Sequence, residues 1–149
     1  MKHIYLILSM SIIAFSCNNL TNKKNRDLSN DIIDMLHSQT ESWNAGSLDS
    51  FMSKGYWKSD SLQFITPKGI KLGYEKVLNG YKKSYPNKAA MGYLEFNDIK
   101  VLSLDDKKSI YQVFGHWDVR KDEKSTGGFF SLIIKNINGE PKIVIDHTY

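Results

Sequence analysis

Few side chains in this sequence have the types and spacing that catalysis or metal binding requires. Three histidines follow residue 16, His37, His116 and His147, and none has the H-x-x-x-H spacing of a helical metal site. The chain also lacks a G-x-S-x-G nucleophile motif, a phosphate-binding glycine loop and a dinucleotide fingerprint. We therefore expect no metal, no cofactor and no covalent hydrolase chemistry. Non-covalent acid–base chemistry stays open.

The alternation of side chains along strands limits which of these groups meet. In a predicted strand over residues 109–120, His116 and Asp118 share the more polar face, and Trp117 lies on the opposite, more apolar one. Near the end of the chain, Ile143, Ile145 and His147 alternate with Val144, Asp146 and Thr148. Adjacent Asp146 and His147 therefore cannot pair as a dyad, and His147 is predicted to face inward.

The single cysteine points to a different chemistry. A basic start, Met1 to His3, precedes twelve uncharged residues, Ile4–Phe15. That length suits the apolar part of a secretory signal, about 7–15 residues, and falls short of the roughly 20 that a membrane-spanning helix needs. The run ends in Ala-Phe-Ser-Cys, and Ser16-Cys17 resembles the lipobox of bacterial lipoproteins. The resemblance implies cleavage before Cys17 and acylation of Cys17.

This interpretation divides the chain into three parts. Residues 1–16 are a lipoprotein signal peptide, residues 17–26 are the lipidated cysteine and a flexible tether, and residues 27–149 form one domain. We expect an exported protein of the bacterial cell envelope, held at a bilayer by acylated Cys17, with the side of the membrane left open. The net charge of +4 comes from scattered lysines rather than a basic stripe, so nucleic acid is not an expected partner.

The pattern of the mature chain predicts helices first and long strands afterwards. Apolar residues recur at helical spacing over 28–43, 47–52 and 74–85, and Asp27 or Ser29 is a candidate cap for the first helix. Short strands are predicted at 62–66 and 70–72, and longer ones at 92–104, 109–120, 128–136 and 142–148. This order favours an α+β domain with a curved, mainly antiparallel sheet and helices over one face.

The order of elements and several local motifs resemble the nuclear transport factor 2-like fold, the cone-shaped architecture of ketosteroid isomerase and SnoaL-like proteins. The motifs are Trp43 to Asp49, Ser59-Asp60, Gly73-Tyr74-Glu75, Gly115-His116-Trp117, and Asn138-Gly139 through Thr148. Pro141 departs from the pattern, because relatives usually carry Trp after the last hairpin. The catalytic tyrosine and aspartate of ketosteroid isomerases are not matched, so their activity is not carried over.

The resemblance implies an apolar cavity between the helices and the concave sheet. Our candidate lining is Trp43, Tyr56, Asp60, Tyr74, Tyr81, Trp117 and His147. A buried Asp60 near His147 would act as a general base or share a proton, since desolvation raises the pKa of a carboxyl. The alternative is that Asp60 caps a turn, His147 satisfies a core hydrogen bond and the tyrosines only pack.

Three functions follow from these expectations. The first is a membrane-anchored SnoaL-like domain that binds a small, mostly apolar molecule. The second is an enzyme of the isomerase, cyclase or dehydratase type that uses Asp60 and His147 for proton transfer. The third is a homodimeric interaction module of the cell envelope that associates through its sheet.

Overall fold

The computed structural model describes residues 27–149. The predictions for the signal peptide, Cys17 and the tether lie outside the described residues. Within 27–149, no helix is long and apolar enough to cross a membrane.

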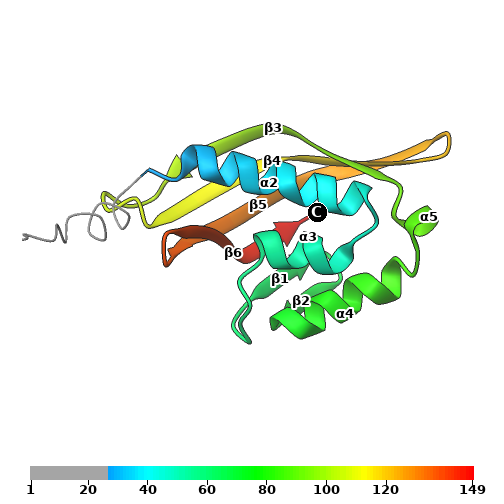
Figure 1. Ribbon diagram of the computed structural model, residues 1–149, viewed down its shortest axis with the longest axis horizontal. Helices are drawn as coiled ribbons and strands as arrows, with labels where there is room; N and C mark the ends of the chain where they lie inside the picture. Colours follow the sequence, from blue (N-terminus) through cyan, green and yellow to red (C-terminus); the bar gives the residue numbers. More distant parts are fainter. Residues whose placement is uncertain (1–26) are drawn as a thin grey trace, which may run out of the picture.

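The helices of the described chain come first, together with two short strands, and the four long strands follow them (Figure 1). Its helices are α2 (Ser29–Asn44), α3 (Leu48–Gly55), α4 (Tyr74–Ser84) and the short α5 (Lys88–Met91). Its strands are β1 (Gln63–Thr66), β2 (Gly69–Leu72), β3 (Tyr93–Ser103), β4 (Ile110–Lys121), β5 (Lys124–Ile137) and β6 (Glu140–Thr148).

The strands form one sheet in the order β2-β1-β6-β5-β4-β3. Neighbouring strands are antiparallel except β1 and β6, which run parallel. Helix α2 contacts β3 and β6, and α3 packs on α2 and β6, so both cover one face of the sheet. The predicted α+β arrangement of helices on a curved, mainly antiparallel sheet is confirmed.

Helix α2 forms because its apolar residues recur every three or four positions and are buried together. The buried stripe includes Ile32, Leu36, Gln39 and Trp43, as predicted. The predicted N-cap is wrong, since the capping position is Leu28 and has no side-chain cap. The Asp27 carboxylate instead accepts hydrogen bonds from the backbone N–H and hydroxyl of Ser29, at 2.9 and 2.7 Å.

One strand boundary and one short helix differ from the sequence-based expectation. The predicted strands end at residue 120 and begin again at residue 128, but β5 already begins at Lys124, which pairs with Lys121. The residues that start β5 are polar or glycine and exposed, so they lack the apolar alternation that signals a strand. Helix α5 was not predicted, because four residues are too few to show helical periodicity.

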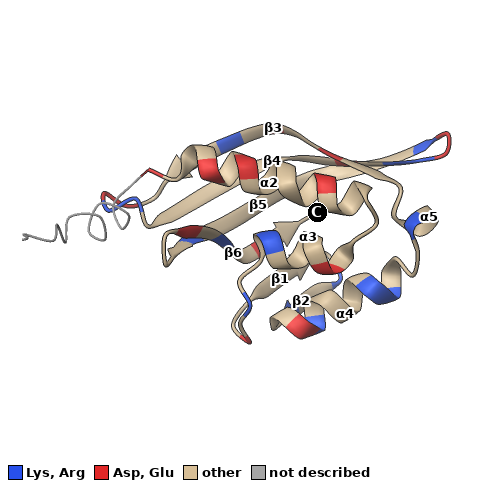
Figure 2. Cartoon of the chain, in the orientation of Figure 1, with Lys and Arg blue, Asp and Glu red and all other residues tan. Residues whose placement is uncertain are grey.

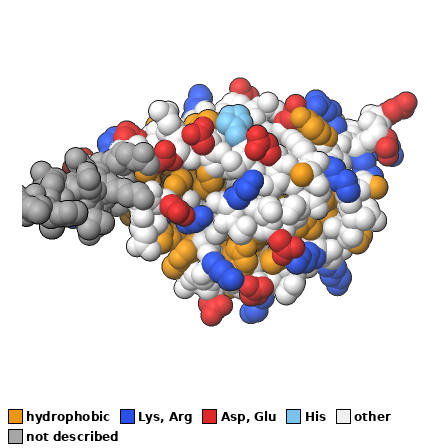
Figure 3. Space-filling view, viewed as in Figure 1, with side chains coloured by type: hydrophobic (Ala, Val, Ile, Leu, Met, Phe, Trp, Pro, Cys, Tyr) orange, Lys and Arg blue, Asp and Glu red, His pale blue; other side chains and the backbone are white. Residues whose placement is uncertain are grey.

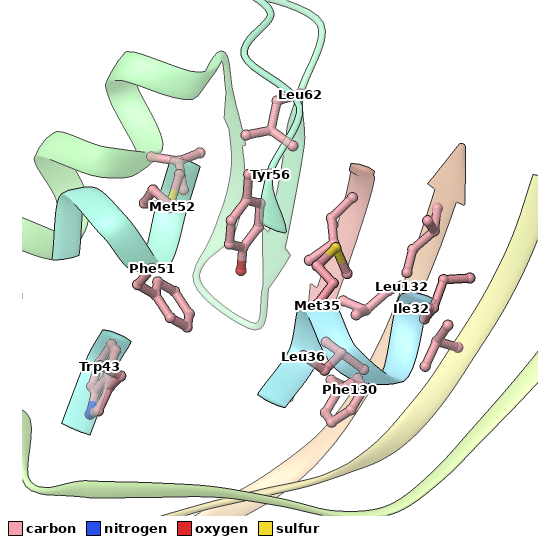
Figure 4. Close-up of a cluster of buried hydrophobic side chains, with 14 of the residues drawn as sticks. Ile32, Met35, Leu36, Trp43, Phe51, Met52, Tyr56, Leu62, Phe130 and Leu132 are labelled. Carbon is pink, nitrogen blue, oxygen red and sulfur yellow. The ribbon is translucent and has the colours of Figure 1, made fainter. Parts of the chain in front are cut away.

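The core lies between the helices and the inner face of the sheet. Figure 4 shows Trp43, Phe51, Met52 and Tyr56 from the helical layer turned toward the same interior as Phe130 and Leu132 from β5. Lys, Arg, Asp and Glu residues occur along the helices, at the turns and on parts of the strands, with both signs mixed (Figure 2). The space-filling view shows the same mixture around smaller hydrophobic patches (Figure 3). The buried residues, by contrast, are mainly hydrophobic.

Candidate functional site: an aromatic cavity under the helices

A cavity of about 150 Å³ lies between the helices and the inner face of the sheet. Helix α2 supplies Leu36, Gln39 and Trp43 to its wall. The remaining wall residues come from α3, α4 and the strands or lie just beyond them: Phe51, Tyr56, Phe64, Tyr81, Tyr85, Leu94, Phe96, Trp117, Val119, Phe130, Leu132, Ile143, Asp146 and Thr148. More than half of the wall residues are aromatic, and none is Lys, Arg or His.

Asp146 is the carboxylate of this wall and is 4% exposed. The Tyr56 hydroxyl donates a hydrogen bond to Asp146 Oδ2 at 2.6 Å, and Thr148 Oγ1 donates to Oδ1 at 2.6 Å. Burial raises the pKa of the Asp146 carboxyl, and this outweighs the two hydrogen bonds and the charge of His147, which act in the opposite direction. Asp146 is thus shifted toward the pH range in which general acids and bases work.

The tyrosines around Asp146 stay neutral. Burial raises the pKa of Tyr56, Tyr81 and Tyr85, and the Asp146 charge adds to the effect at Tyr56 and Tyr81. Tyr56 and Tyr81 also hydrogen-bond to each other. These phenols therefore serve as hydrogen-bonding groups rather than as anions.

Two glycines make room for the aromatic wall on the sheet. Gly115 on β4 lies opposite Phe130, and a Cβ at this position would meet Phe130 Cζ at 2.9 Å. Gly128 on β5 lies opposite Trp117, and a Cβ there would come within 3.1 Å of the indole Nε1. That indole N–H is buried and has no hydrogen-bond partner among residues 27–149. At both positions the glycine therefore leaves space beside an aromatic side chain of the wall.

The cavity adjoins a wider outer groove of about 650 Å³ between α4 and the β1–β2 hairpin. Phe64, Tyr81, Tyr85, Trp117 and Thr148 line both spaces. The outer groove therefore gives the interior a route toward solvent.

The structure brings four of the seven predicted lining residues together: Trp43, Tyr56, Tyr81 and Trp117. Tyr74 is buried at 6% exposure but does not line the cavity. Asp60 is exposed in the turn beside Gly73. His147 is exposed as well, so the predicted buried Asp60–His147 pair is wrong.

A β-bulge explains the error at His147. Ile133 of β5 pairs with Ile145, whereas the next residue, Ile134, pairs with Ile143, so Val144 is an extra residue on β6. An extra residue reverses the alternation of side chains beyond it. Ile143 and Val144 are both buried, and after them Asp146 faces the cavity while His147 faces outward. The residue types around Val144 carry no signal of the bulge.

The outer face of the sheet carries its own aromatic cluster. The His116 ring lies 4.1 Å from the Phe129 ring, and Tyr149 lies 6.2 Å from Phe129 and 4.9 Å from His147. His116 Nδ1 is 3.2 Å from Asp98 Oδ2. The predicted division of β4 is confirmed, since Tyr111 and Val113 are buried and Trp117 lines the cavity. Among residues 27–149, no group of three or more His, Cys, Asp or Glu side chains is placed to hold a metal ion.

The sheet topology and the inner cavity define a cone-shaped α+β protein, and comparison with solved structures gives the same class. No family model matches the sequence, and no curated protein matches it. An NTF-2 like protein of unknown function from Shewanella oneidensis is 33% identical, with 80% of this chain and 97% of that chain covered and a TM-score of 0.75. The chain belongs to the nuclear transport factor 2-like (NTF2-like) proteins.

More distant structures show the same fold. An NTF2-like superfamily protein from Salmonella enterica is 17% identical over 80% of this chain and 88% of that chain, with a TM-score of 0.61. An NTF-2 like protein of unknown function from Burkholderia xenovorans is 16% identical over 80% and 82%, with a TM-score of 0.56.

Proposed function

We propose that this protein binds a small, mostly apolar molecule in the aromatic cavity, as a lipoprotein anchored to a bacterial membrane by acylated Cys17. The observation that carries the binding role is the cavity of about 150 Å³ with aromatic walls and one buried carboxyl, Asp146. An apolar cavity of this size is large enough for a ligand of benzene dimensions.

The energetics of the cavity support a ligand. Residual cavity volume in a sealed core costs about 24 cal/mol per Å³, so 150 Å³ that held neither water nor ligand would cost at most about 4 kcal/mol. That is a large part of the typical stability of a small domain, about 5–15 kcal/mol. A ligand that fills the space recovers contacts that the empty core lacks.

Native mass spectrometry of the purified chain tests the binding role. We expect a co-purifying molecule, or binding of a small apolar compound such as benzene or indole, and loss of both in Val119→Phe, which adds volume to the cavity wall. Ile133→Phe is the matched control, because Ile133 pairs with Ile145 and lies on the opposite face of the sheet. Equal binding by wild type and Val119→Phe would contradict this site, and absence of any binding would contradict the function.

Labelling with palmitate tests the anchor. We expect label on the wild-type chain in cells and none on Cys17→Ala, because the proposed acyl chains are attached at Cys17. Two or more such chains would hold the protein stably at a bilayer. Cys17 is the only cysteine, so no other thiol competes for the label. Retention of label in Cys17→Ala would contradict acylation at this residue.

A second candidate role is association of two copies through the outer face of the sheet. Ile70 and Leu72 on β2 and Phe129 on β5 are 63%, 53% and 54% exposed, which is unusual for large apolar side chains on a sheet. Analytical ultracentrifugation checks this role. A dimer that Phe129→Glu converts to monomer supports it, and a monomeric wild type at high concentration contradicts it.

A further inference from the structure

The cavity combines a buried carboxyl without a cationic partner and a wall of aromatic rings. None of its wall residues is Lys, Arg or His, and the hydrogen-bond donors to Asp146 are the neutral hydroxyls of Tyr56 and Thr148. A buried carboxylate is costly unless a positive charge or sufficient hydrogen bonds compensate it. His147 is the nearest basic residue along the chain, and it faces the other side of the sheet.

Aromatic faces attract cations, and a desolvated cation over such rings gains more than an exposed one. Trp43, Phe51, Tyr81 and Tyr85 approach from the helical side, with edge-to-face contacts of 4.8–5.5 Å among Trp43–Tyr85, Trp43–Phe51 and Phe51–Tyr81. Phe96 and Phe130 approach from the sheet, 5.3 Å apart. The rings therefore surround the space on two sides, and Asp146 supplies the negative charge.

We propose that the ligand of this cavity is a small organic cation, an amine or quaternary ammonium compound with an apolar body, held by Asp146 and the aromatic wall. This inference rests on the proposed binding function and names the class of its ligand. Each carboxylate oxygen has a second acceptor position, so Asp146 can contact a cation while keeping its bonds to Tyr56 and Thr148.

The size of the cavity and the charge of its surroundings restrict the ligand further. A volume of about 150 Å³ admits roughly the space of a benzene ring, which suits a choline-sized cation. Lys68 and Lys71 line the outer groove rather than the cavity, and both are exposed. Salt screens exposed charges beyond about 8 Å at physiological ionic strength, so these lysines do not prevent cation binding inside.

Isothermal titration calorimetry with choline and its neutral isostere 3,3-dimethylbutan-1-ol tests this inference. The two probes have almost the same shape and differ in charge. We expect choline to bind the wild-type chain at least about tenfold more tightly than the isostere. Asp146→Asn is expected to remove that preference, and Asp60→Asn, which removes an exposed carboxylate outside the cavity, is expected to keep it. Phe96→Leu is expected to weaken choline binding more than isostere binding.

Each outcome separates the inference from the function on which it rests. Equal affinity for the two probes, or tighter binding of the isostere, would overturn the cationic ligand and leave the apolar binding site intact. If neither probe binds, the proposal of a cationic ligand is overturned as well. The native mass spectrometry described above then tests separately whether the cavity binds an apolar molecule. The comparison of two probes on the wild-type chain holds even if Asp146→Asn does not fold.

Discussion

Both faces of the sheet carry aromatic rings, but the outer face is more polar and is not covered by helices. Phe130 on the inner face is 4% exposed beneath the helices, whereas its neighbour Phe129 on the outer face is 54% exposed. Aromatic rings cluster on both sides, around Tyr81 within and around Phe129 outside. Aromatic residues on a strand face therefore do not alone decide whether that face becomes core. Helices α2, α3 and α4 cover one face and form the cavity, which adjoins the outer groove, and they leave the other face open.

The largest expected effect comes from truncating these two neighbouring phenylalanines. Phe130→Ala should lower the free energy of unfolding by about 3–5 kcal/mol, since it removes a buried ring and enlarges the cavity. Phe129→Ala should change it by less than about 1 kcal/mol in a monomer. Chemical denaturation at several protein concentrations measures both. Equal losses at low concentration would show that the outer face is as closed as the inner one.

The next prediction compares the loss of one tyrosine hydroxyl on each face of the sheet. Tyr56→Phe removes the hydroxyl that donates to buried Asp146, and we expect a loss of about 1–3 kcal/mol in the free energy of unfolding. Tyr149→Phe is the control, because Tyr149 is 54% exposed and its side-chain hydroxyl is not engaged like that of Tyr56. A neutral Tyr56→Phe variant would mean that this hydrogen bond does not hold Asp146 in place.

The pH dependence of stability should distinguish Asp146 from an exposed carboxylate. Because burial raises the pKa of Asp146 in the folded state above its ordinary 3.8, the folded protein holds this proton more strongly than the unfolded chain. The free energy of unfolding should therefore fall as pH rises from about 3.8 through the raised value, relative to Asp146→Asn. Asp60→Asn controls for the loss of one carboxyl group. A wild-type curve parallel to that of Asp146→Asn would contradict the raised pKa.

The smallest effect is expected for the contact between His116 and Asp98 on the outer face. The side chains of His116 and Asp98 are 39% and 78% exposed, and exposed pairs contribute about 0–1 kcal/mol. His116→Gln should therefore change the free energy of unfolding by less than about 1 kcal/mol. Thermal unfolding at pH 6 measures this change. A larger loss would indicate that the outer face is buried against another molecule in solution.

Sequence periodicity predicted the fold well wherever side chains alternate without interruption. The inward set of β4 and the buried stripe of α2 follow from spacing alone. The site was predicted only in part, because the extra residue Val144 exchanges Asp146 and His147 between the two faces. A bulge depends on the pairing of β5 with β6, which is a tertiary property. The prediction that Asp60 is buried was wrong for a related reason, because the burial of a turn depends on what packs over it.

One contact at the start of the described domain determines how it would bear a pulling force. The backbone N–H of Leu28 donates to the hydroxyl of Tyr111 at 2.9 Å, and Tyr111 is fully buried on β4, the strand next to edge strand β3. Lys108 Nζ lies 3.3 Å from Asp27 Oδ2 at the same end. A pull on the preceding chain therefore acts on β4 as well as on α2. Figure 1 places α5 and the β4–β5 turn at the end of the molecule opposite to this contact, whereas α4 and β2 lie along its lower side.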